Sequence, residues 1–89
     1  MSAYRVEFTR SAEKEFERLS LGIQTKAAEA LQLLAISPFS DLLKVKKLKG
    51  ADKLYRVRIG EYRIVYEVRK KELLVLVIKF GHRREVYRR

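Results

Sequence analysis

The stretch YRVRIGEYRIVY, residues 55–66, decides the fold that this sequence predicts. Apolar and charged residues alternate along it, and a period of two is typical of a β-strand with one buried face. Gly60-Glu61 interrupts the alternation as the two-residue turn of a β-hairpin does. We therefore expect one face of this hairpin to pack on a core and the opposite, open face to present Arg56, Arg58 and Arg63.

The residues before the hairpin predict one strand followed by two helices. Residues 3–8 alternate like a half-buried strand, and apolar residues recur at helical spacing from Ala12 onward. Residues 20–22 interrupt this first helix. A second helix is predicted for residues 23–36, and Pro38 prevents its continuation. The short break between the helices indicates a helical hairpin.

The residues after the hairpin complete a sheet. Residues 73–80, LLVLVIKF, are almost wholly apolar, which is typical of a central strand covered on both faces. Residues 44–50 are basic and fit either a short strand or a loop. The order of elements predicts an α+β fold, with an N-terminal strand and a two-helix hairpin packed on one face of a mostly antiparallel, twisted sheet of about four strands. Residues 1–89 are expected to form a single domain.

Positive charge is concentrated in the second half of the chain. The net charge is +10, and residues 43–89 hold sixteen Lys and Arg against five acidic residues. A domain with this distribution attracts polyanions, of which nucleic acid is the commonest. A basic surface that serves only solubility is the alternative.

The composition excludes several other kinds of site. The chain has no cysteine and one histidine, so neither a disulfide nor an ordinary zinc site can form. The sequence lacks the cluster of acidic residues that a magnesium-dependent nuclease needs, and it has no glycine-rich phosphate loop. We expect no cofactor and no metal. No leading segment resembles a signal peptide and the longest apolar run is far below the ~20 residues that span a bilayer, so a cytoplasmic location without membrane contact is expected.

The arginines of the hairpin suit a phosphate ligand. Arg56 and Arg58 point the same way along a strand, about 6.5–7 Å apart. A guanidinium donates bidentately to phosphate and keeps its charge. Neighbouring segments bring further cations toward the same surface, and these are Lys47, Lys49, Arg83 and Arg84.

Because the sequence offers no metal site, any cleavage of nucleic acid by this chain has to proceed without a metal. RNA, unlike DNA, allows such a reaction. The 2′-hydroxyl of RNA can attack the adjacent phosphate, so a protein has to supply only orientation, charge stabilisation and proton transfer. Imidazole titrates near neutral pH, which makes His82 the candidate for proton transfer. Tyr87 could stack on a base or donate its hydroxyl. The alternatives are a surface histidine without a role and a tyrosine that plugs the sheet edge.

Several motifs together resemble a known family. They are KLKG at residues 47–50, LYRVRIGEYRIVYEV at residues 54–68 and LLVLVIKFGHRREVY at residues 73–87. With the helical hairpin before them, they are similar to the RelE/ParE superfamily of bacterial and archaeal toxin–antitoxin modules. The resemblance covers residues 4–87 and is closer to the RelE branch than to ParE.

This resemblance implies a ribosome-dependent mRNA endonuclease that cleaves the codon in the A site, and a cognate antitoxin that blocks it. The 2′-hydroxyl attacks, leaving a 2′,3′-cyclic phosphate and a 5′-hydroxyl. Matched residue by residue, Arg58, Arg63 and Arg83 would bind phosphate and stabilise the transition state. His82 would transfer a proton and Tyr87 would stack on the base. The residues expected to anchor RNA are Lys47, Lys49, Arg56 and Arg84.

The hairpin also departs from the family. Well-studied RelE-type toxins carry lysines on the first hairpin strand, one of them proposed as the general base, where this chain has Arg56 and Arg58. An arginine keeps its proton and is a poor base, so that role would fall to His82. Two other functions stay open: a ParE-like inhibitor of DNA gyrase, and an inactive basic module that binds nucleic acid or an antitoxin.

Overall fold

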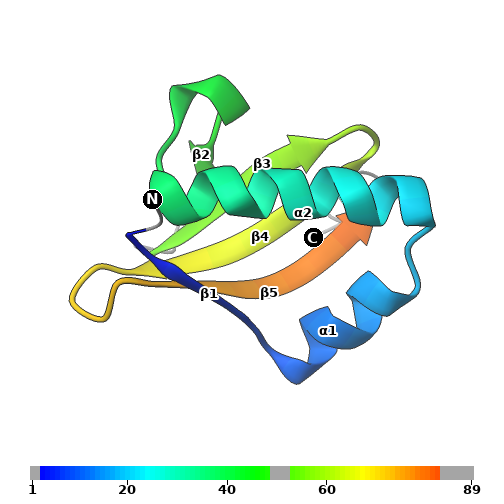
Figure 1. Cartoon of the computed structure of the whole chain (residues 1–89), viewed down its shortest axis with the longest axis horizontal. Coiled ribbons are helices and arrows are strands. Elements are labelled where there is room, and N and C mark those ends of the chain that lie inside the picture. Colours follow the sequence, from blue (N-terminus) through cyan, green and yellow to red (C-terminus); the bar gives the residue numbers. More distant parts are fainter. Residues whose placement is uncertain (1–2, 49–52, 83–89) are drawn as a thin grey trace.

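The structure of the chain is a computed structural model that describes residues 3–48 and 53–82. In these residues, five strands, two α-helices and one short 3-10 helix follow one another (Figure 1). In chain order they are β1 (Arg5–Phe8), α1 (Arg10–Glu17), α2 (Leu21–Ile36), η1 (Asp41–Leu43), β2 (Lys46–Lys47), β3 (Leu54–Ile59), β4 (Tyr62–Arg69) and β5 (Leu74–His82).

The strands form one mixed sheet in the order β1-β5-β4-β3-β2. β1 is parallel to β5, and every other neighbouring pair is antiparallel. The predicted α+β fold with a mostly antiparallel sheet is therefore confirmed. The described part of the chain has five strands instead of about four, because Lys46–Lys47, in the segment that fitted either a strand or a loop, pairs with β3.

Both helices cover one face of the sheet, with α2 over β3 and β4 and α1 beside β5 (Figure 1). They begin earlier than the apolar spacing predicts, at Arg10 and Leu21. The cause is capping: the Thr9 hydroxyl accepts a hydrogen bond from the N–H of Ala12 at 3.1 Å, and Ser20 caps α2 in the same way. Neither helix of the described segments is long and apolar enough to cross a membrane.

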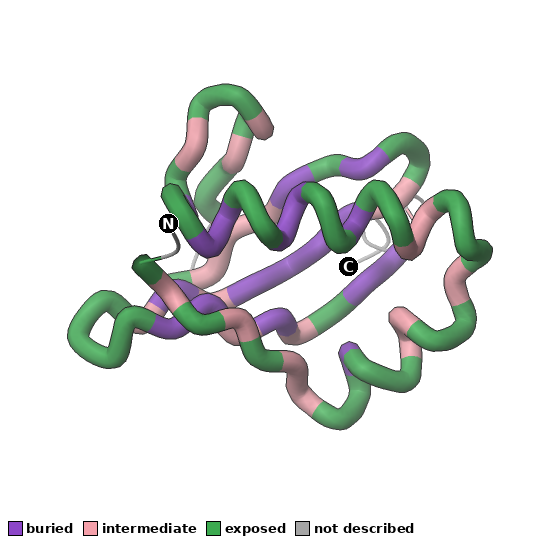
Figure 2. Tube along the Cα trace, viewed as in Figure 1, coloured by how far each residue is buried: buried purple, intermediate pink, exposed green. Residues whose placement is uncertain are grey.

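The core lies between the two helices and the sheet face beneath them (Figure 2). Alternate residues of the hairpin strands are buried there, as the period of two predicts, and each buried aliphatic side chain contributes about 1.5–3 kcal/mol. The largest fully buried side chains are Leu34, Val57, Ile64, Tyr66, Val75 and Val77. Small residues on the helices, among them Ala27 and Ala30, let α2 approach the sheet closely.

Helix α1 closes the part of β5 that β1 leaves uncovered. β1 ends at Phe8, which pairs with Val77, so the next backbone groups of β5 have no strand on that side. One carboxylate oxygen of Glu15 accepts a hydrogen bond from the N–H of Phe80 at 2.8 Å, and the other lies 3.1 Å from Lys79 Nζ. The Glu15 side chain thus takes the place of a neighbouring strand.

We expect Glu15→Ala to lower the free energy of unfolding by about 1–3 kcal/mol, because it leaves the part-buried N–H of Phe80 without its acceptor. Chemical denaturation followed by circular dichroism measures the change. Glu17→Ala, an exposed substitution on the same helix, is the control and should stay within about 0.5 kcal/mol of the unmodified chain. Equal stability of the two variants would contradict this role of Glu15 at the edge of β5.

Candidate nucleic-acid interface

The β3–β4 hairpin separates its arginines from the core. Gly60 turns the chain with φ at 66°, a conformation that glycine adopts without strain, and the two-residue loop fixes the register. In that register Arg58 stands directly opposite Arg63, and Arg56 stands opposite Val65. Since the alternate residues of both strands face the helices, all three arginines belong to the helix-free face of the sheet.

Arg63 differs from the other two arginines in being enclosed. Only 2% of its surface is exposed, whereas Arg58 is exposed and Arg56 is half-buried. The sequence predicted an open position for Arg63, and this expectation was wrong. β4 is an inner strand between β3 and β5, while β3 is bordered only by the two residues of β2. Because a guanidinium is not deprotonated in proteins, Arg63 holds a permanent positive charge inside the surface, next to Arg58.

A pocket of about 330 Å³ opens along the outer side of β3. It is lined by Leu42, Leu43, Lys44, Lys46, Arg56 and Arg58, and we call it the arginine pocket. Lys46 belongs to it because it is the cross-strand partner of Arg56. Four cations from three segments therefore surround one concavity, which is an arrangement suited to a phosphate backbone.

Sequence reasoning missed Lys44 and Lys46 in this pocket and chose Lys47 instead. Lys47 pairs with Tyr55, on the opposite parity of β3, and lines a different pocket. Only the register of β2 against β3 distinguishes the two lysines, because a shift of one residue moves a side chain to the other face. The predicted RNA contact of Lys47 therefore does not join Arg56 and Arg58 in the arginine pocket.

Aromatic residues hold the wall of the arginine pocket in place. The Tyr66 hydroxyl donates a hydrogen bond to the carbonyl oxygen of Pro38 at 2.6 Å, which ties the segment before η1 to the sheet. The Phe39 ring meets Tyr55 edge-on at 5.1 Å, and Tyr55 stacks on Tyr66 at 6.0 Å. Leu42, Leu43 and Lys44 form their wall of the pocket directly after this anchor.

We expect Tyr66→Phe to lower the free energy of unfolding by about 1–3 kcal/mol, because the buried Pro38 carbonyl loses its donor. For a domain of this size the melting temperature should fall by roughly 5–15 °C, measured by calorimetry. Tyr55→Phe removes a hydroxyl from the neighbouring ring and is the control, with little expected change. A Tyr66→Phe melting temperature equal to that of the control would refute the anchor.

The same tyrosine gives a pH dependence. Burial, and then the neighbouring Tyr55, raise the pKa of the Tyr66 phenol above its ordinary value of 10.0. Above about pH 10 the unfolded chain releases this proton while the folded chain keeps it, so the stability that Tyr66 contributes is complete below that pH and declines above it. Tyr66→Phe should therefore lose stability less steeply than the unmodified chain between about pH 10 and 12, in denaturation measured across that range.

His82 ends β5 in register with Tyr62. Its ring meets the Tyr62 ring edge-on at 5.3 Å, and its Nε2 lies 3.8 Å from Glu61 Oε1. The neighbouring residue Gly81, and not His82, stands opposite Arg63. The structure therefore places His82 at the hairpin end, in the register of the helix-facing pairs and not in that of the arginines.

A β-bulge in β5 explains this position of His82. Val65 pairs with Lys79 and Tyr66 with Val77, which leaves Ile78 between them without a partner residue. The alternation shifts by one there, and Val77 and Phe80 both lie in the core although three positions separate them. Bulges commonly re-aim the side chains that follow them.

Four of the residues predicted from the sequence lie outside the described residues, and they are Lys49, Arg83, Arg84 and Tyr87. Within residues 3–48 and 53–82, no three His, Asp or Glu side chains gather as metal ligands would. The candidate site that the structure builds is thus cationic, with Arg58 and Arg63 paired across the hairpin and the arginine pocket beside them.

The sequence of this chain is similar to those of known toxins. The family model described as the ParE toxin of the type II toxin–antitoxin system parDE matches residues 6–87. The mRNA interferase toxin RelE of Escherichia coli K12 is 30% identical over 89 residues, which cover 96% of this chain and 90% of that protein.

Solved structures give the same relationship. The archaeal RelE–RelB complex from Pyrococcus horikoshii superposes with a TM-score of 0.81 at 28% identity, covering 91% of this chain and 96% of the matched chain. The isolated E. coli RelE toxin superposes with a TM-score of 0.80 at 30% identity, covering 97% and 93%. The fold of this chain is therefore the one that these toxins share.

Proposed function

Because this chain belongs to the RelE/ParE family of toxins of type II toxin–antitoxin systems, we propose that it is a ribosome-dependent mRNA endonuclease that cleaves the codon in the A site without a metal. The enclosed charge of Arg63 opposite the exposed guanidinium of Arg58 is the observation that carries this proposal. A phosphate that reaches Arg58 meets two fixed positive charges on the helix-free face of the sheet.

The RNA itself supplies the nucleophile of this reaction. The 2′-oxygen forms a bond to the adjacent phosphorus while the bond from phosphorus to the 5′-oxygen breaks. The 2′-hydroxyl gives its proton to a base and the 5′-oxygen receives one, so the products are a 2′,3′-cyclic phosphate and a 5′-hydroxyl. Arg58 and Arg63 stabilise the extra negative charge of the pentacoordinate state, and the ribosome aligns the message.

We assign proton transfer to His82, which follows Gly81, the residue opposite Arg63, although its own register is that of the helix-facing pairs. The hairpin arginines keep their protons and cannot act as the base. The Glu61 carboxylate lies 3.8 Å from Nε2, which is beyond hydrogen-bond distance but allows an ion pair when the imidazole is protonated. A His82→Gln variant with an unchanged pH–rate profile in single-turnover cleavage would remove histidine from the mechanism. Arg83 and Tyr87 keep the phosphate and base-stacking roles that the family resemblance implies.

RNA binding outside the reacting phosphate is assigned to the surrounding cations. Arg56 lines the arginine pocket, and Lys46 and Lys44 join it there. The sequence-based assignments of Lys47, Lys49 and Arg84 remain part of the proposal. Together they would hold the message, or ribosomal RNA beside it, through contacts that weaken with salt.

A cognate antitoxin is the second partner that we propose. The RelE chains of P. horikoshii and E. coli were crystallised with RelB. The net charge of +10 favours an antitoxin with an acidic segment that covers the basic surface. A ribosomal target also gives this chain a cytoplasmic location.

Primer extension on messages isolated after induction of this chain tests the function. We expect new 5′ ends inside translated coding regions and none in the same message with its start codon removed. Cleavage that does not depend on translation, or no new ends while growth stops, would contradict the proposal.

One observation favours a second function. The matching family model carries the description of the ParE toxin, so a ParE-like inhibitor of DNA gyrase remains the alternative. A supercoiling assay with purified gyrase separates the two, because an mRNA endonuclease should leave gyrase activity unchanged. Binding of RNA by the purified chain, with no new 5′ ends after induction and with unchanged gyrase activity, would instead support the inactive basic module.

A further inference from the structure

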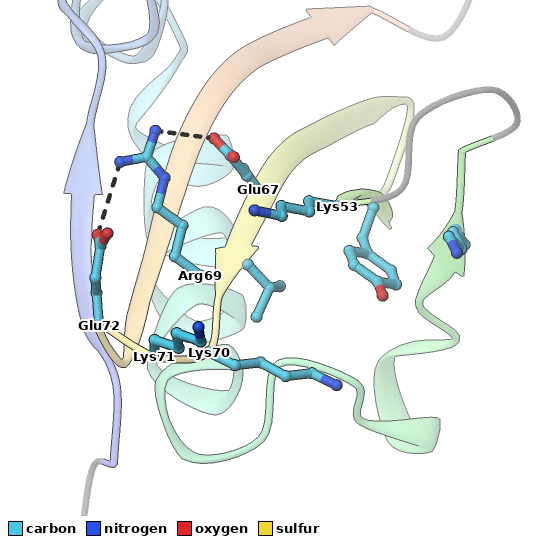
Figure 3. A pocket seen from close by; sticks show the side chains of 9 residues that line it. Lys53, Glu67, Arg69, Lys70, Lys71 and Glu72 are labelled. Atoms are coloured by element: carbon cyan, nitrogen blue, oxygen red, sulfur yellow. Dashed lines mark hydrogen bonds and ion pairs between the residues drawn. The ribbon is translucent and has the colours of Figure 1, made fainter.

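A second and larger pocket lies at the end of the sheet opposite the Gly60-Glu61 turn (Figure 3). It has a volume of about 660 Å³ and collects lysines from three parts of the chain. We call it the lysine pocket after Lys47 of β2, Lys53 before β3, and Lys70 and Lys71 of the β4–β5 turn. All four side chains are exposed, so their ammonium groups are accessible from solution.

The acidic residues of this pocket are already engaged. Arg69 lies 3.3 Å from the Glu67 carboxylate and 3.7 Å from that of Glu72, and Figure 3 shows both contacts on the same guanidinium. Among the residues that the structure describes, no ion pair joins any of the four lysines to a carboxylate. The lysine pocket therefore has an excess of positive charge, which an anionic ligand would neutralise.

Packed side chains form the floor of the lysine pocket. Tyr55 lines it and is held between Phe39 and Tyr66, at ring distances of 5.1 and 6.0 Å. Val68 lines it beside Tyr55 and is buried. Lys70 Nζ lies 5.3 Å from the centre of the Phe39 ring, a cation–π contact that positions this ammonium group. A ligand in this pocket would therefore meet the lysine ammonium groups around the Tyr55 ring, which its aromatic neighbours hold in place.

Strand β2 connects the lysine pocket to the arginine pocket. Its two residues alternate, so Lys46 lines the arginine pocket and Lys47 lines the lysine pocket. The two side chains point to opposite faces, and β2 is the edge strand of the sheet. One polyanionic chain that passes around this edge would meet the two pockets in succession.

We propose that the lysine pocket is a second phosphate-binding site, which holds the backbone of the same RNA that the arginine pocket engages. This inference rests on the proposed function for the identity of the ligand. A lysine ammonium binds phosphate as a point charge and does not need the planar fork that arginine offers. Arg69, the guanidinium among the described residues of this pocket, is occupied by Glu67 and Glu72, so binding would fall to the four lysines. The arginine pocket on the other side of β2 is what points to an RNA backbone, and an acidic peptide is the rival that the experiment tests.

Binding of a short, uncleavable 2′-O-methyl RNA to the full chain tests the inference. Lys70→Gln/Lys71→Gln removes two charges from an exposed turn, and Lys14→Gln/Lys26→Gln removes two from exposed positions of α1 and α2 as the matched control. Each lost phosphate contact lowers the salt slope by about 0.7, so the pocket variant should bind about 20-fold more weakly at ~0.1 M salt with a slope smaller by about 1.4. Lys53→Gln, from a different segment, should lower the slope by about half as much.

Each outcome decides between the inference and its rivals. An equal loss for both double variants would overturn it, because net charge alone would then explain binding. A pocket variant that binds RNA normally but loses an acidic peptide would also overturn it in favour of a protein ligand. Inorganic tripolyphosphate that competes as well as the RNA would show that the pocket takes free polyphosphate, and the claim of an RNA site would fail.

The proposed function is tested separately in the same experiment. The methylated RNA cannot react, so pocket-dependent binding supports the second site whether or not the chain cleaves messages. Cleavage by the unmodified chain, together with unchanged RNA binding by the pocket variants, would refute the lysine pocket and leave the endonuclease in place.

Discussion

The Arg58→Ala variant is expected to cleave ribosome-bound mRNA about 10²–10³-fold more slowly than the unmodified chain. Arg58 is the exposed member of the pair that faces Arg63, so it is the guanidinium that a scissile phosphate reaches first. The loss should fall on the cleavage step, because the interaction strengthens as charge develops on the phosphate oxygens. Single-turnover cleavage on purified ribosomes measures it.

Two further variants separate charge from geometry at this position. Arg58→Lys keeps a positive charge but loses the planar fork, so its rate should lie between those of the unmodified chain and Arg58→Ala. Arg18→Ala removes the same charge from an exposed position at the end of α1 and should cleave normally. Cleavage by Arg58→Ala at the rate of the Arg18→Ala control would rule out Arg58 as a catalytic residue.

The Arg63→Met variant is expected to lose cleavage by a similar factor, about 10²–10³. Methionine has an unbranched side chain that occupies much of the same enclosed space, but it lacks the positive charge that stands directly opposite Arg58. Single-turnover cleavage measures the loss, and thermal unfolding of the same preparation shows whether the variant stays folded.

Arg63→Lys is the matched control for this experiment. It retains the charge in the same enclosed position, so it should keep more activity than Arg63→Met. A fully active Arg63→Met would show that the enclosed charge has no part in the reaction. A variant that loses activity only because its melting temperature collapses would show that Arg63 serves the fold instead of the chemistry.

The architecture could be predicted because its information is local. A period of two around Gly60-Glu61 defines the hairpin, and the helical spacing before it defines two helices. The helix starts were missed by two residues, since Thr9 and Ser20 act through side-chain oxygens that apolar spacing does not register. β2 was left open because two residues are too few to form a pattern.

The site was harder to predict because it depends on long-range register. Whether Lys46 or Lys47 accompanies Arg56 is decided by pairing with β3, which lies beyond the intervening loop. The bulge at Ile78 falls inside a uniform apolar run, so nothing in the sequence marks the shift that moves His82. Alternation assigns Arg63 to the helix-free face, but it does not describe what encloses a side chain on that face, so its burial could not be predicted.

The carboxylate of Glu15 also bears on how this chain behaves in the company of its own copies. A row of unsatisfied backbone groups along the rim of a sheet is a template on which another molecule can polymerise. Where β1 ends, the Glu15 side chain occupies the Phe80 N–H of β5, so that donor is not offered to another molecule. At the opposite edge, the two exposed lysines of β2 would bring like charges together if two copies paired there. Both features oppose edge-to-edge pairing of this sheet with a second copy.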